Sequence, residues 1–156
     1  MTPLESILPL IIHASTTLAR LLEVLRAEQD LLVQNRIDGL SALLPEKQQT
    51  AALADASART LQAFLAANGV EGSEASVRGW LQANAAQAIE AWDTLREYAR
   101  QAAAINRSNG TLIDTRRHLI DGFLHDIASE RQDDIQVYSE RGRMHSGAGT
   151  IRRDKA

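Results

Sequence analysis

The chain has 156 residues, enough for one domain with a buried core, and its formal net charge at pH 7 is −3. With three prolines, nine glycines, 44% hydrophobic residues and few aromatics, its composition is typical of packed helices rather than of a β-sandwich. The absence of cysteine excludes disulfides and thiolate metal ligands and fits a reducing compartment.

Charge is unevenly distributed along the chain. Residues 141–156 carry a net charge of +4, which leaves −7 on residues 1–140. Proteins that bind nucleic acid place basic residues along a folded face, so this pattern argues against nucleic acid as a partner. We also expect no membrane span and no secretory signal. No apolar run approaches the roughly 18 to 20 residues of a span, and the N-terminus lacks a basic segment.

The first predicted helix covers about residues 4–35. Leucine or isoleucine recurs every seven residues from Leu4 to Leu32. Heptads of this kind produce an amphipathic helix with a coiled-coil-like seam. The first helix is therefore expected to pack along its length against another helix.

Two more helices are predicted, over residues 38–68 and 74–131. In the second of these, apolar and alanine residues keep one helical phase from Leu81 to Ile127 without a slip. The phase continues across the polar sequence NRSNG at residues 106–110. A loop would reset it, so we expect one long helix in which glycine is tolerated at a cost of about 1 kcal/mol relative to alanine.

The predicted fold class is all-α. We expect an elongated antiparallel bundle of three to four long helices with coiled-coil-like packing over residues 1–137, and a flexible basic tail over residues 138–156. The sequence leaves open whether the last helix bends or breaks near Gly110.

The length of the last helix suggests a binding surface. At about 1.5 Å per residue, residues 74–131 would span roughly 85 Å, against roughly 45–50 Å for each earlier helix. Either the last helix folds back near Gly110, or its end carries an apolar stripe without a partner inside the chain. A stripe of that kind is a predicted protein-binding surface. Its residues are Ile113, Ile120, Phe123, Leu124 and Ile127.

One group of residues has the spacing of a metal site. Asp114, His118, Asp121 and His125 follow one another at intervals of four, three and four, which places them on one helix face. Carboxylates and imidazoles in helical bundles can bind zinc or iron, but the helical di-iron pattern needs a second set that the chain lacks. The sequence favours a solvated face here, and it contains no recognisable catalytic motif. We therefore expect no metal, no cofactor and no enzymatic activity.

Asn106 and Asn109 occupy positions where the stripe would otherwise be apolar. A polar residue in a helix seam costs stability but fixes register. The pair is either such a register device or the boundary between a stable half of the bundle and a labile half that binds a partner. The sequence does not decide between these two interpretations.

Four local sequences occur in the order in which they are found in the FlgN-type flagellar export chaperones, and the chain resembles that family over nearly its whole length. They are RAEQDLL, with Glu28 and Gln29; LSALLPEKQQ, with Glu46 and Lys47; INRSNGTLI, with Asn106, Asn109 and Gly110; and VYSERGR, with Tyr138.

The resemblance implies a cytoplasmic chaperone of the flagellar type III export system. Such chaperones bind hook–filament junction (hook-associated) proteins through their terminal helices, prevent their premature association and deliver them to the export apparatus. In the family the C-terminal part of the chaperone binds cargo. A tyrosine just past the last helix, in the position of Tyr138, docks on the export gate membrane protein, and the export ATPase complex is a further expected partner. The alternative is a structural coiled-coil adaptor or dimerisation module, which would form a homo-oligomer.

Overall fold

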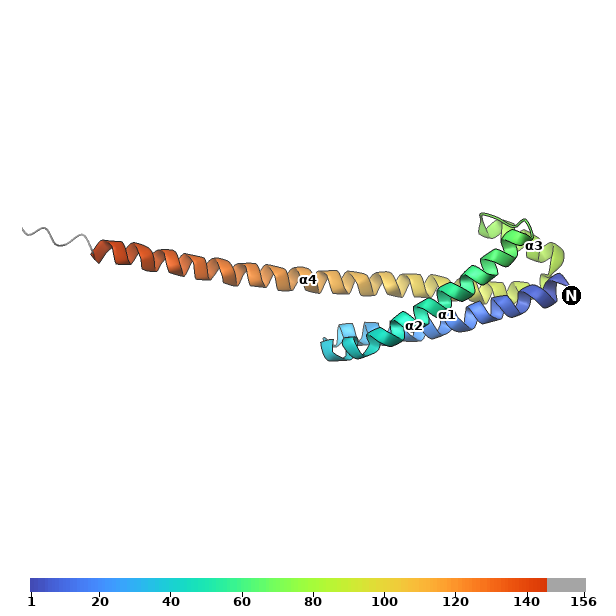
Figure 1. Ribbon diagram of the computed structural model, residues 1–156, viewed down its shortest axis with the longest axis horizontal. Helices are drawn as coiled ribbons and strands as arrows, with labels where there is room; N and C mark the ends of the chain where they lie inside the picture. Colours follow the sequence, from blue (N-terminus) through green and yellow to red (C-terminus); the bar gives the residue numbers. More distant parts are fainter. Residues whose placement is uncertain (146–156) are drawn as a thin grey trace, which may run out of the picture. The chain divides into compact units, whose positions relative to one another are not determined.

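The computed structural model describes the backbone of residues 1–145 and the side chains of residues 1–129 (Figure 1). The described backbone forms four α-helices and one short 3-10 turn and contains no strand, so the predicted all-α class is confirmed. The helices are α1 (Pro3–Val33), α2 (Ile37–Ala67), α3 (Glu74–Asn84) and α4 (Ile89–His145), and the 3-10 turn η1 (Ala86–Ala88) precedes α4. The chain divides into two compact units, Met1–Ile113 and Asp114–Ala156.

Helix α1 is defined at both ends by local hydrogen bonds. At its start, the Thr2 hydroxyl accepts from the backbone N–H of Glu5 at 3.2 Å, and the Glu5 carboxylate accepts from the Thr2 N–H at 2.7 Å. This reciprocal arrangement satisfies two backbone donors that the first turn would leave free. The Thr2 backbone also lowers the pKa of the Glu5 carboxyl, because it hydrogen-bonds the ionised form. At the other end Asn35 takes a positive φ of 59° and turns the chain into α2.

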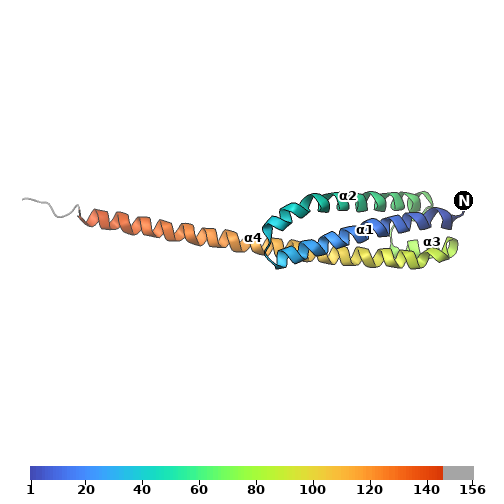
Figure 2. The same ribbon diagram turned by 90° about the horizontal axis from the view of Figure 1, so that it is seen from below.

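By length and mean hydropathy α1 is the one described helix that could cross a membrane, whereas no span is predicted from the sequence. The core helix of a soluble protein passes the same test, so this is weak evidence for a span. In the first unit α1 instead packs against α2 and against the first part of α4 (Figure 2). Its apolar residues Ile7 and Ile11 are fully buried there.

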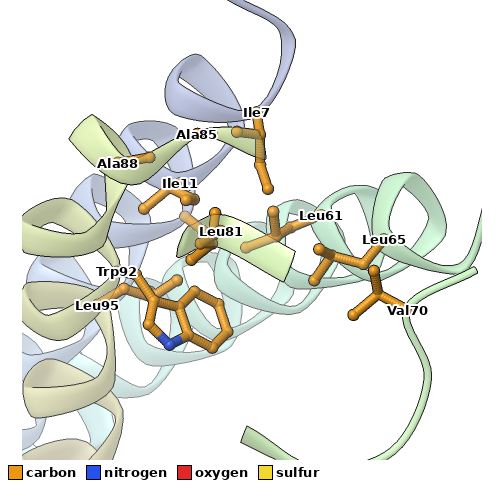
Figure 3. Close-up of a cluster of buried hydrophobic side chains, with 11 residues drawn as sticks. Ile7, Ile11, Leu61, Leu65, Val70, Leu81, Ala85, Ala88, Trp92 and Leu95 are labelled. Carbon is orange, nitrogen blue, oxygen red and sulfur yellow. The ribbon is translucent and has the colours of Figure 1, made fainter. Parts of the chain in front are cut away.

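The main hydrophobic core joins α1, α2, α3 and the start of α4 (Figure 3). Leu81 of α3 is fully buried at its centre, and Trp92 of α4 is 8% exposed beside it. A ring contact continues this packing outward, because the ring centroids of Phe64 and Trp80 lie 6.1 Å apart in an edge-to-face arrangement. The core residues are Ile7, Ile11, Ala14, Leu61, Leu65, Val70, Leu81, Ala85, Ala88, Trp92 and Leu95.

The single helix predicted over residues 74–131 is wrong at its start. Helix α3 ends at Asn84, whose side-chain amide donates to the Trp80 carbonyl at 2.9 Å. Ala85 then leaves the helical region, with φ −155° and ψ 52°, and α4 begins at Ile89. The apolar phase missed this break because Leu81, Ala85 and Ala88 point into the same core on both sides of it.

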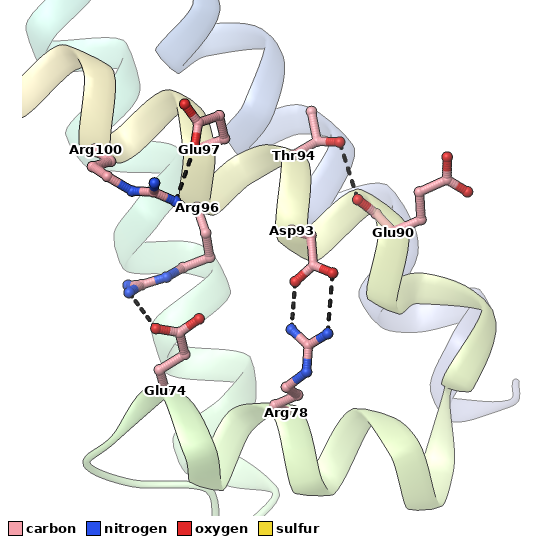
Figure 4. A network of polar contacts seen from close by, with 8 residues as sticks. All are labelled: Glu74, Arg78, Glu90, Asp93, Thr94, Arg96, Glu97 and Arg100. Atoms are coloured by element: carbon pink, nitrogen blue, oxygen red, sulfur yellow. Dashed lines mark hydrogen bonds and ion pairs between the residues drawn. The ribbon is translucent and has the colours of Figure 1, made fainter.

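Ion pairs hold α3 against α4 (Figure 4). The Arg78 guanidinium donates to both carboxylate oxygens of Asp93, and Arg96 pairs with Glu74. The hydrogen bonds from Arg78 hold the pKa of the Asp93 carboxyl below its ordinary range, and Asp93 in turn raises the pKa of Arg78. All four side chains are between 41% and 49% exposed, so the pairs orient α3 more than they stabilise it.

Helix α4 passes through residues 106–110 without interruption, which confirms the prediction of a continuous helix there. A Cβ added at Gly110 would meet no atom within 4 Å, so neither a turn nor close packing requires glycine. The alternative of a break that folds the helix back at Gly110 is wrong. The helix also continues beyond the expected residue 131, to His145; residues 123–141 contain no glycine or proline, and Gly142 lies inside the helix without ending it. The expected flexible tail is therefore helical over residues 138–145, and its remainder, residues 146–156, lies outside the described residues.

Candidate functional site

Exposed apolar side chains gather on α4 within residues 113–127. Four of them are more than half exposed: Leu119, Ile120, Phe123 and Leu124. Ile113, the last residue of the first unit, is 43% exposed, and Ile127 is half-buried. These residues include every member of the predicted stripe. Leu119 was missed, although it lies four residues before Phe123 and therefore on the same side of the helix. We call the set Ile113, Leu119, Ile120, Phe123, Leu124 and Ile127 the α4 stripe.

A buried polar cluster, which we call the clamp, lies just before the stripe and joins three helices. Asn109 of α4 is 1% exposed, and its amide donates to the Leu25 carbonyl at 2.9 Å and to Glu28 Oε2 at 2.8 Å. The other Glu28 oxygen accepts from Lys47 of α2 at 2.7 Å. Hydrogen bonds to a charged partner are the stronger kind, so the clamp ties α1, α2 and α4 at one level of the bundle.

Two more residues that carry the family resemblance, Gln29 and Glu46, also have partners on other helices of the bundle. Gln29 donates to Ser108 at 3.3 Å, and Arg20 pairs with Glu46 at 2.6 Å. Sequences that are far apart in the chain are therefore brought together by the bundle. Asn106, in contrast, is exposed and takes no part in the clamp.

Of the two interpretations of the asparagines, the geometry of Asn109 favours the register device. Its amide has specific partners on α1, and a shift of α4 along α1 would break both bonds. Its Oδ1 accepts no hydrogen bond from the described residues, so burial of this side chain also has a cost. A buried polar residue that costs stability but fixes the alignment of two helices is typical of a register device.

The spacing that suggested a metal site does not produce one within the described side chains. Asp114, His118, Asp121 and His125 are all exposed. Among residues 1–129 no three carboxylate or imidazole groups lie where they could hold a metal ion. These four side chains therefore contact solvent.

The expected position of Tyr138 just past the last helix is wrong. Residue 138 lies inside α4, which ends only at His145, and its side chain lies outside the described residues. Any role of Tyr138 must therefore be considered on a helix rather than on a tail.

A helical bundle that leaves a broad apolar helix face exposed belongs to the class of proteins that bind other proteins through helices. Comparison with known families makes this specific: residues 1–146 match the model of the FlgN protein family. The chain belongs to the FlgN family of flagellar export chaperones. No curated protein and no solved structure matches the chain.

Proposed function

We propose that this protein is a cytoplasmic export chaperone that binds hook–filament junction (hook-associated) subunits, prevents their premature association and delivers them to the flagellar type III export apparatus. The observation that carries the proposal is the exposed α4 stripe in a chain of the FlgN family. The terminal helix of such a subunit, here called the client helix, would cover the stripe with its own apolar face.

Physical chemistry supports a helical client. A short amphipathic helix is marginal alone in water, because most of the stability of a helix in a protein comes from burying its apolar face. Docking on Phe123 and its neighbours would supply that burial while removing their own exposed surface. Ordering the client consumes part of the interaction energy, which keeps the complex reversible, as a carrier requires.

The proposal assigns a separate role to Tyr138, the docking of the chaperone on the export gate membrane protein, with the export ATPase complex as a further partner. We expect Tyr138→Ala to leave client binding unchanged and to weaken capture of the export gate protein. Equal loss of both activities would instead indicate that Tyr138 supports the fold.

The test of client binding uses two isoleucines of nearly equal exposure. Ile120, 55% exposed, is in the stripe, whereas Ile12, 52% exposed, lies on α1. Ile120→Asp places an unpaired carboxylate in the proposed interface and should weaken capture of hook-associated proteins more than tenfold. Ile12→Asp should leave capture unchanged, and equal capture by both variants would disprove the placement of the site.

A second candidate function has one observation in its favour. Isoleucine recurs at heptad spacing at positions 113, 120 and 127, a pattern typical of helices that pair with a copy of themselves. A dimerisation module would sediment as a dimer and lose that state in Ile120→Asp without ever capturing a flagellar subunit.

A further inference from the structure

A groove, here called the corner groove, lies where α1 turns into α2, and α4 supplies its third wall. Its volume is about 220 Å³. Its lining combines aliphatic side chains with one serine and one ion pair: Leu40, Leu43, Leu44, Ile113, Ser41, Glu28 and Lys47. The groove is larger than the roughly 30 Å³ of one water molecule but smaller than the roughly 300–1,000 Å³ of typical small-molecule sites. It therefore suits one bulky side chain of a partner better than a cofactor.

Local packing holds the walls of this groove in place. The backbone N–H of Arg36 donates to the Leu31 carbonyl at 3.0 Å and fixes the turn between the two helices. At the start of α2, a Cβ added to Gly39 would stand 2.6 Å from Leu31 Cδ2, so the backbone of α2 approaches the end of α1 closely. A preformed groove loses little conformational entropy when it is filled, which favours binding.

The chemistry of the groove selects an uncharged occupant. Glu28 Oε1 accepts from Lys47, and Glu28 Oε2 accepts from Asn109, so both carboxylate oxygens are engaged within the clamp. A lysine or arginine of a partner would lose its hydration in the groove without gaining a free carboxylate. An aliphatic side chain would instead cover Leu44 and Ile113, which are 51% and 43% exposed.

We propose that the corner groove receives one aliphatic anchor residue of the client helix, and this inference rests on the proposed chaperone function. Ile113 links the two surfaces, because it lines the groove and is the first residue of the α4 stripe. Ile120 and Ile127 follow it at heptad spacing in the same continuous helix. A client helix that packs on Ile113 therefore also contacts the groove, which Ile113 lines together with Leu44.

The test uses the intact chain and two leucines of α2 with nearly equal exposure. Leu44, 51% exposed, lines the groove, and Leu53, 54% exposed, does not. Affinity is measured by fluorescence anisotropy with labelled peptides that cover the terminal helices of the hook-associated proteins of the same bacterium. Leu44→Ser should weaken binding of the peptide about tenfold, whereas Leu53→Ser should leave it unchanged. Equal affinity of the two variants overturns the groove proposal.

The same titration with Ile120→Asp separates the two proposals. If Ile120→Asp loses the peptide but Leu44→Ser binds like Leu53→Ser, the groove proposal fails and the chaperone function stands. If Ile120→Asp binds like the unmodified chain, the proposed function fails and the groove proposal fails with it.

Methyl spectra of the 17.1 kDa protein supply a measurement that needs no substitution in the protein itself. On addition of the peptide, the methyl resonances of Leu43, Leu44 and Ile113 should shift together with those of the α4 stripe. The anchor is the peptide residue that enters the corner groove. Its replacement by alanine should remove the shifts of Leu43 and Leu44 and preserve those of the stripe. Shifts limited to the stripe with the original peptide overturn the proposal.

Discussion

The two units use the same apolar heptad pattern in different ways. In the first unit the heptad residues Ile11, Leu25 and Leu32 are between 0% and 2% exposed, because neighbouring helices cover them. In the second unit the heptad residue Ile120 is 55% exposed. The described part of that unit is a single helix, and one helix cannot bury its own apolar face. Heptad spacing therefore identifies a face that requires a partner but not where the partner comes from.

The units also differ in how they treat polar residues. The first unit buries Glu28 and Asn109 with specific partners, so its alignment is fixed by hydrogen bonds as well as by packing. The charged residues of the second unit whose side chains are described flank its stripe in solvent, apart from the half-buried Arg116. A rigid first unit beside an exposed stripe fits the proposed chaperone role, because the stable part of a chaperone must persist while clients bind and leave.

The largest expected effect contrasts two isoleucines in the two units. Ile11→Ala removes a fully buried side chain and should lower the free energy of unfolding by about 3–4 kcal/mol. Ile120→Ala should change it by less than about 0.5 kcal/mol, since that side chain is exposed. Urea unfolding followed by the fluorescence of Trp80 and Trp92, both in the first unit, measures the difference. Similar losses in both variants would mean that the stripe contributes to the core.

A second, smaller effect tests the clamp. Lys47→Met leaves the Glu28 carboxylate, only 9% exposed, without its cation and should cost about 2 kcal/mol. Arg59→Met breaks an exposed pair with Asp55 on the same helix and should cost less than about 0.5 kcal/mol. Urea midpoints of the two variants give the comparison. If Lys47→Met unfolds at the same midpoint as Arg59→Met, the clamp does not stabilise the first unit.

The sequence alone predicted much of the fold for a physical reason. Heptads in residues 4–35 and a continuous phase through residues 106–110 report directly on helix faces, and both helices are present. The break at Ala85 was missed because Leu81 before it and Ala88 after it pack into one core, and periodicity records burial rather than backbone continuity. The extension of α4 to His145 was missed because a polar composition with Gly142 predicts disorder, whereas the helix continues through that glycine.

The candidate site was predictable only in part. The helical spacing of the apolar residues identified the stripe, and the length of the helix predicted that these residues would be exposed. The contact of Asn109 with Glu28 joins residues 81 positions apart, and no local pattern pairs them. Likewise, the corner groove depends on how the α1–α2 turn meets Ile113, which only the three-dimensional packing determines.

A third comparison uses two serines. The Ser73 hydroxyl accepts from the Ser76 backbone N–H at 3.3 Å and caps α3, whereas Ser129 lies inside α4 and donates to the His125 carbonyl. Ser73→Ala should therefore lower the free energy of unfolding by about 1 kcal/mol. Ser129→Ala should cause no loss, because alanine is the better residue within a helix. Thermal unfolding followed by circular dichroism distinguishes the two, and a loss from Ser129→Ala alone would reverse the assignment.

The smallest expected effect is the pH dependence that comes from Asp93. Hydrogen bonds from Arg78 hold the pKa of this carboxyl below its ordinary value of about 3.9. Because the pKa in the folded state lies below that in the unfolded chain, the stabilisation is complete above the unfolded pKa. It is lost as the pH falls through the folded pKa. Asp93→Asn should therefore unfold at slightly lower urea than the unmodified chain at pH 7, and the difference should shrink in acid.

The control removes the cause of the shift. In a chain that already carries Arg78→Met, adding Asp93→Asn should produce no difference that depends on pH, because the cation that favours the ionised carboxyl is gone. Both partners are nearly half exposed, so salt should also reduce the effect at pH 7. If the difference between Asp93→Asn and the unmodified chain grows as the pH falls, or persists unchanged in the Arg78→Met chain, the ion pair is not its source. The attachment of α3 to α4 would then depend on the Glu74–Arg96 pair and on buried contacts such as those of Leu81 and Trp92.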